Sequence, residues 1–110
     1  MCSILGIIDF DKKNHKKEIE IKNINDLLSH RGPDDTGFFS DEYIALAFNR
    51  LSIIDLKNGN QPVKRDHIIS IFNGEIYNFK EVKNQLKSIG YQFKTNSDSE
   101  IIPAAFLEWG

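Results

Sequence analysis

The residue most able to act as a nucleophile is Cys2, the only cysteine of the chain, which directly follows Met1. The small side chain of Cys2 would allow an aminopeptidase to remove Met1, and Cys2 would then carry both a thiol and a free α-amine. Both groups titrate within about two pH units of neutrality, so the amine can serve as general base for the thiol. Taken alone, this stretch favours an ordinary buried or exposed cysteine, and only its combination with other residues predicts a nucleophile.

Four further residues could bind or polarise a small ligand. Arg50 ends an apolar run, where a fixed guanidinium can hold a carboxylate through two parallel hydrogen bonds. An ion pair with a neighbouring carboxylate is the alternative, and the local sequence favours it. Asn73 and Gly74 form either a tight turn or a pair of donors aimed at one oxyanion. Asp98 either caps the last helix or accepts a hydrogen bond from a ligand ammonium group.

The composition is that of one small globular domain. The chain has 110 residues, of which 40% are hydrophobic and 27% are charged, enough for a single core. Its net charge of −2 offers no electrostatic basis for binding nucleic acid. A single cysteine excludes an internal disulfide, no Cys/His cluster has metal-ligand spacing, and no segment resembles a signal peptide or a membrane span. We therefore expect a cytoplasmic domain without a metal site or a membrane partner.

The elements that must position these residues begin with a strand and a helix. Residues 4–10 are nearly all apolar and predict a buried strand, which would hold Cys2 rigidly, and a charged loop follows at residues 11–17. The helix after it should end at residues 30–33, because Gly and Pro end helices. Its apolar face is predicted from residues at spacings of three and four, which are Ile21, Ile24, Leu27 and Leu28.

A loop and a hairpin should lead to Arg50. Residues 30–37 contain two glycines and a proline, and Asp34 and Asp35 can hydrogen-bond their own backbone there. Residues 38–39 and 43–48 then predict a hairpin across the polar turn at residues 40–42. Its second strand should direct Ile44, Leu46 and Phe48 to one face.

The second half predicts strands followed by two helices. Residues 52–56 are an apolar run, residues 57–62 a turn with Asn-Gly as its signal, and residues 68–72 a strand that stops at Asn73. A helix should begin after Asn78, with Glu81 completing a capping box, and end at Gly90. One face of this helix is predicted to contain Phe79, Val82, Leu86 and Ile89.

The end of the chain predicts a short strand at residues 91–95 and a last helix. Pro103 must lie in the first turn of that helix, which makes Ser99 a better N-cap than Ser97. The helix would carry Ile101, Ile102, Ala105, Phe106 and Trp109.

Taken together and in order, these strings resemble the glutamine-hydrolysing domain of class II glutamine amidotransferases, and most closely that of the asparagine synthetases. The resemblance spans the whole chain and rests on MCSI at residues 1–4, HRGPDDTG at 30–37, RLSIID at 50–55, NGEIYN at 73–78 and Ser97-Asp98.

The resemblance implies a role for each matching residue. Cys2 would be the nucleophile, with its own α-amine as general base, and Asn73 and Gly74 would stabilise the oxyanion. The residues implied to bind glutamine are Arg50 for its α-carboxylate, Glu75 and Asp98 for its α-ammonium group, and Leu51 and Ile53.

The resemblance also implies a fold and a wider context. The fold would be α+β, the N-terminal nucleophile hydrolase sandwich of antiparallel sheets between helical layers. Residues 1–110 would be its N-terminal part, incomplete at the C-terminus and without the synthetase domain. That domain would use ATP and Mg²⁺ to make asparagine from aspartate and the released ammonia, whereas the glutaminase domain needs no cofactor. The implied partners are glutamine and a synthetase domain or subunit, with a homodimer left open. A non-catalytic remnant, a regulatory partner and an amidotransferase with another acceptor are the alternatives.

Overall fold

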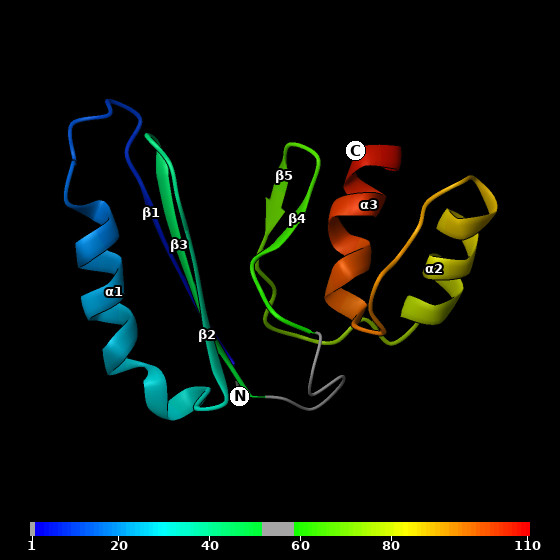
Figure 1. The fold of residues 1–110 in the computed structure, drawn as a ribbon, viewed down its shortest axis with the longest axis horizontal. Coiled ribbons are helices and arrows are strands. Elements are labelled where there is room, and N and C mark those ends of the chain that lie inside the picture. Colours follow the sequence, from blue (N-terminus) through cyan, green and yellow to red (C-terminus); the bar gives the residue numbers. More distant parts are fainter. Residues whose placement is uncertain (1, 52–58) are drawn as a thin grey trace.

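The structure is a computed structural model and describes residues 2–51 and 59–110. Figure 1 shows, from left to right, helix α1 (Lys17–Leu27), a three-stranded sheet, and the hairpin of β4 (Val63–Arg65) and β5 (Ile68–Ser70). Helix α3 (Ile101–Trp109) lies next to the hairpin, and helix α2 (Phe79–Ser88) packs on α3. Both sheets are antiparallel and lie between helices. The predicted α+β class is therefore confirmed. The predicted run at residues 52–56 lies outside the described residues.

The three-stranded sheet brings the start of the chain to the end of the predicted hairpin. Its order is β1 (Ser3–Ile8), β3 (Ile44–Arg50), β2 (Asp35–Ser40), with both pairs antiparallel. The register pairs Ser3 with Asn49 on one side of β3, and Asp35 with Arg50 on the other. Cys2 therefore lies at the sheet edge where β3 ends. The hairpin prediction is confirmed, and Asp41 closes its turn by accepting the backbone N–H groups of Tyr43 and Ile44 at 2.8 Å.

Helix α1 covers one face of this sheet, on which β3 presents small residues. Ile21 packs on Ala45 and Ala47, and all three are almost completely buried. The predicted face of the helix is partly wrong, because Ile24 and Leu27 are 45% and 74% exposed. The residues that α1 buries are spaced four apart and include two polar ones: Lys17, Ile21 and Asn25.

The first strand is buried on one face rather than two, which corrects the prediction. Helix α1 covers one face of the sheet, so alternate residues of β1 face away from it, and Ile4 and Ile8 are 45% and 61% exposed. Phe10 lies beyond the strand, in the turn that follows. The second face of the sheet therefore remains apolar and partly open.

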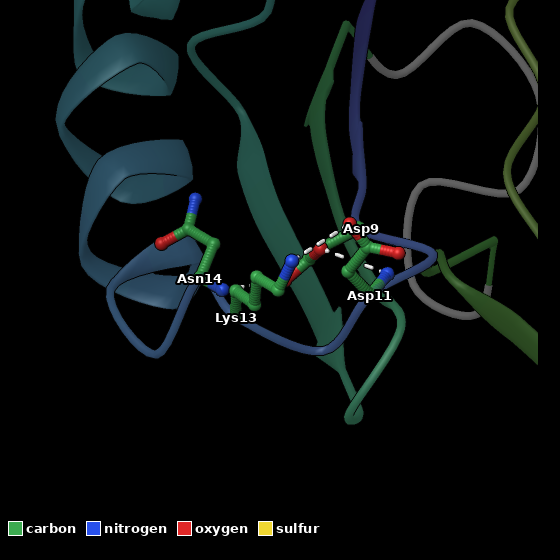
Figure 2. A network of polar contacts seen from close by, with 4 residues as sticks. All are labelled: Asp9, Asp11, Lys13 and Asn14. Carbon is green, nitrogen blue, oxygen red and sulfur yellow. Dashed lines mark hydrogen bonds and ion pairs between the residues drawn. The ribbon is translucent and has the colours of Figure 1, made fainter.

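A carboxylate shapes the loop between β1 and α1 (Figure 2). The side chain of Asp9 accepts the backbone N–H groups of Asn14 and Asp11, and Lys13 donates to the carboxylate of Asp11. The N–H of Asn14 is the main reason why the pKa of Asp9 lies below its ordinary value, with burial opposing it. The predicted charged loop is thus an ordered turn, and α1 already begins at Lys17.

The second half forms a separate core around Leu86, Ile101 and Ala104. Helix α2 ends as predicted, because Gly90 has the left-handed φ of 106° that suits the residue after a helix. Asn78 is at the N-cap position, but its side chain makes no capping hydrogen bond, so the predicted capping box is wrong. Among the helices of the described residues, none is long and apolar enough to cross a membrane.

The predicted strand at residues 91–95 is a loop, and Glu100 explains why. The Glu100 carboxylate accepts the backbone N–H groups of Lys94 and Thr95 at 2.8 Å and the Thr95 hydroxyl at 2.7 Å. These donors need no neighbouring strand. Ser99 lies in the short 3-10 helix η2 (Asp98–Glu100) and hydrogen-bonds Ser97, so it is not the N-cap of α3.

Glu100→Gln should lower the free energy of unfolding by about 1–3 kcal/mol at pH 7, because an amide cannot accept all three donors. Burial raises the pKa of Glu100, but the hydrogen bonds from Lys94 and Thr95 outweigh it and leave the pKa below its ordinary value of 4.5. The stabilisation is complete above the ordinary pKa and is lost as the pH falls through the lowered value.

Urea denaturation across this pH range measures the effect, with the exposed Glu81→Gln as control. The difference between wild type and Glu100→Gln should shrink as the solution becomes acidic. A difference that stays constant with pH would show that the Glu100 charge is unimportant.

Candidate active site

A cavity of about 380 Å³ lies where the two halves of the chain meet, and every predicted site residue that the structure describes lines it. Ile53 falls outside the described residues. The volume is at the lower end of the range for small-molecule sites, about 300–1,000 Å³. The lining comes from the edge of the three-stranded sheet (Cys2, Phe48, Arg50, Leu51), from Gln61, from the segment after β5 (Phe72, Asn73, Gly74, Glu75, Tyr77) and from Asp98.

The thiol of Cys2 is held against the chain that leaves β3. Its Sγ accepts the backbone N–H of Leu51 at 3.3 Å and lies 3.5 Å from the carbonyl oxygen of the same residue. An N–H in this position stabilises negative charge on sulfur, whereas the carbonyl receives the S–H of the neutral thiol. The half-buried sulfur thus has a backbone partner for each of its protonation states.

A buried polar network fixes the strand that carries Cys2. The Asn49 amide nitrogen donates to the Ser3 hydroxyl and to the carbonyl oxygen of Asn25, both at 3.1 Å. Its amide oxygen accepts from the Asn25 side chain at 2.8 Å and from the Thr36 hydroxyl at 3.2 Å. Helix α1 and all three strands are therefore joined at Asn49, whose partner Ser3 directly follows Cys2.

The two predicted oxyanion donors lie close to Cys2. The side-chain nitrogen of Asn73 donates to the backbone carbonyl of Cys2 at 3.0 Å. A primary amide has two N–H groups, so this bond orients Asn73 and leaves a second hydrogen for a ligand. Asn73 and Gly74 are both exposed at the cavity, because β5 ends at Ser70, two residues earlier than predicted.

The glycines of the 30–37 segment allow the main chain to pass close to the site. A Cβ on Gly32 would lie 2.4 Å from the backbone carbon of Asn49, and one on Gly37 would lie 1.6 Å from the carbonyl oxygen of Gln61. Both distances are far inside van der Waals contact. Any side chain at either position would displace the end of β3 or Gln61, and with it the cavity wall.

Charges of opposite sign come to the cavity from different elements. Arg50, at the end of β3, is 6% exposed, and its guanidinium donates to the side chain of Asn60 at 3.2 Å. Asp98 is 8% exposed and accepts the backbone N–H of Ile76 at 2.9 Å, so it does not cap α3. Glu75 is exposed. One cation and two carboxylates complement a ligand that carries both a carboxylate and an ammonium group.

Sequence reasoning missed several residues of the cavity wall. Gln61 lies in a segment that reads as a turn, and its hydrogen bonds span 11 residues of sequence. Phe48 and Phe72 were predicted only as strand residues, although both line the cavity. The local sequence does not mark Gln61 as a wall residue, because the partner of its side chain, Phe72, lies 11 residues further along the chain.

The described residues form an α+β fold with antiparallel sheets between helices, which is consistent with an N-terminal nucleophile hydrolase-like domain, and Cys2 precedes its first strand and lines the cavity. More specifically, the chain belongs to the family described as glutamine amidotransferase domain, whose model matches residues 1–110.

The similar proteins are asparagine synthetases. Asparagine synthetase (glutamine-hydrolyzing) 1 of Bacillus subtilis is 42% identical over 115 residues, which cover 99% of this chain and 18% of that protein. Asparagine synthetase B (glutamine-hydrolyzing) of Escherichia coli is 39% identical, over 100% of this chain and 20% of that protein. An Arabidopsis thaliana asparagine synthetase is 35% identical over 100% of the chain and 19% of its own length. The chain thus spans about a fifth of the length of these curated relatives.

Asn49→Ala should lower the free energy of unfolding by about 2–4 kcal/mol, because it leaves buried partners in α1, β1 and β2 without their hydrogen bonds. The exposed residue Asn84 provides the matched control, and Asn84→Ala should change the stability by no more than about 0.5 kcal/mol. Urea denaturation of the three proteins measures both values. Equal stabilities for the two variants would contradict a structural role for the network.

Proposed function

We propose that this domain hydrolyses glutamine to glutamate and ammonia through a cysteine thioester. The observation that carries the proposal is the convergence of Cys2, a guanidinium, two carboxylates and two N–H donors on one cavity, in a chain of the glutamine amidotransferase family. A non-catalytic remnant would have no physical need to keep this set together.

Ion pairs would bind the α-carboxylate and the α-ammonium group of glutamine. Arg50 takes the α-carboxylate, and its burial limits competition from water. Glu75 and Asp98 take the α-ammonium group, while Leu51 lines the same wall and Ile53 is assigned by resemblance alone. This arrangement directs the side-chain carboxamide toward Cys2.

The reaction uses the thiol as nucleophile. After removal of Met1, the α-amine of Cys2 takes the thiol proton, and sulfur attacks the carboxamide carbon to form a tetrahedral intermediate. The C–N bond then breaks, and the protonated amine returns its proton to the leaving nitrogen, which departs as ammonia. The amine next activates a water molecule, which attacks the γ-glutamyl thioester, and the C–S bond breaks to release glutamate and the thiol.

The oxyanion of each tetrahedral intermediate would be stabilised by the side-chain nitrogen of Asn73 and the backbone N–H of Gly74. The hydrogen bond from Asn73 to the carbonyl of Cys2 supports this role, because it keeps the amide beside the nucleophile before substrate arrives. Such preorganised donors act mostly on charge that develops during the reaction.

The ammonia would be used for ATP-dependent synthesis of asparagine from aspartate in the cytoplasm. The names of the similar proteins support this acceptor, since each is a glutamine-hydrolyzing asparagine synthetase. The partner would be a synthetase domain or subunit that binds ATP and Mg²⁺, and the domain described here would need no cofactor of its own.

The direct test measures glutamate release from glutamine by the full chain and by Cys2→Ala, with intact mass recorded for both. Wild type should release glutamate and have lost Met1, and Cys2→Ala should be at least about 10³-fold slower because it lacks the nucleophile. Activity that survives in Cys2→Ala would refute the proposed chemistry. Retention of Met1 on an active enzyme would exclude the α-amine as general base.

Asn73→Ala should lower kcat by about 10²–10³ and change KM much less, because the amide acts on the transition state. Steady-state kinetics with glutamine provide both parameters, and Asn84→Ala serves as control. If KM rises steeply while kcat holds, Asn73 binds the substrate instead.

A further inference from the structure

The side chain of Gln61 replaces a missing piece of β-ladder next to Asn73. The hairpin register pairs Val63 with Ser70, and the same register, continued by two residues, sets Gln61 opposite Phe72. Strand β4 begins only at Val63, so the paired strands stop before Gln61 and Phe72. The Gln61 carboxamide makes both bonds instead: it accepts the Phe72 N–H at 2.6 Å and donates to the Phe72 carbonyl at 3.1 Å.

The main chain of Gln61 packs against strand β2 of the three-stranded sheet. Its carbonyl oxygen packs against the backbone of β2, where a Cβ on Gly37 would lie only 1.6 Å away. Gly37 is paired with Phe48 of β3, and β3 ends at Arg50 beside Cys2. Gln61 therefore touches the sheet that carries the nucleophile with its backbone and the segment that carries the oxyanion donors with its side chain.

Two separate contacts hold the ends of the segment that contains the donors. Gln61 holds Phe72, immediately before Asn73 and Gly74, and Asp98 holds the N–H of Ile76 just after them. The Asp98 contact also lies at the proposed ammonium site, whereas the Gln61 side chain binds the residue that immediately precedes the donors. Loss of the Gln61 contact should therefore disturb the donors more than the binding of the α-carbon groups.

We infer that Gln61 is a positioning residue that sets the oxyanion donors of Asn73 and Gly74 against Cys2 through the backbone of Phe72. The inference rests on the proposed glutaminase function. Its physical basis is that a primary amide has a donor and an acceptor side by side and can therefore pair with the N–H and the C=O of one residue at the same time. Donors that drift by about 1 Å lose much of their effect on the reaction.

The test compares Gln61→Met, which keeps the size but removes both hydrogen bonds, with Gln61→Glu, which keeps an acceptor for the Phe72 N–H. Gln92→Met is the matched control, because that side chain is exposed. We expect kcat to fall about 10- to 100-fold in Gln61→Met and less in Gln61→Glu, with KM within about threefold of wild type. The control should keep wild-type kinetics.

Amide hydrogen exchange tests the contact without relying on turnover. The Phe72 N–H of wild type should be protected like the paired amides of β4 and β5, and should exchange faster in Gln61→Met while the amides of β3 stay protected. Absence of Phe72 protection in wild type, unchanged kcat in Gln61→Met, or a rise in KM alone would each overturn the inference. A protected Phe72 in a wild type that releases no glutamate would instead refute the glutaminase function and leave the contact intact.

Discussion

The antiparallel pairing of β1 with β3 is the constraint on which the site depends. Because Ser3 pairs with Asn49, Cys2 meets the chain just where β3 ends, and its sulfur reaches the backbone of Leu51. A slip of one residue would move Cys2 to the face that α1 covers, since side chains alternate along a strand. The buried amide of Asn49 opposes such a slip, because its hydrogen bonds to Ser3 and Asn25 fit one register only.

Polar groups fix positions in this small domain where apolar packing alone would leave freedom. Beneath β3, alanines let α1 approach closely, and a pair of asparagines then sets how far along the sheet the helix lies. Such buried amides are costly unless satisfied, so their benefit is a defined geometry rather than extra stability. In the second half, Glu100 has the same function for the loop after α2, and there the charge strengthens the hydrogen bonds.

The sequence predicts the elements with strong local signals and misses those that depend on distant partners. The hairpin around Asp41 and the end of α2 at Gly90 follow from turn chemistry and are confirmed. The buried place of Asn25 could not be predicted, because apolar Ile24 offers the stronger helical pattern and only Asn49, far along the chain, decides between them. Similarly, residues 91–95 have the composition of a strand, but within the described part of the chain no strand pairs with them.

The candidate site was predictable as a set of residues but not as a geometry. The local sequence allows both a structural and a chemical interpretation of Cys2, Arg50, Asn73 and Asp98. Their presence around one cavity favours the chemical interpretation of each. The arrangement also divides the work between rigid and less regular structure. Cys2 and Arg50 belong to the edge of a packed sheet, whereas Asn73 and Gly74 lie beyond the end of β5, on a segment that side chains hold at both ends. Arg50 and Asn73 are therefore held by different contacts, whereas Asp98 both lies at the proposed ammonium site and holds the segment that carries Asn73 and Gly74.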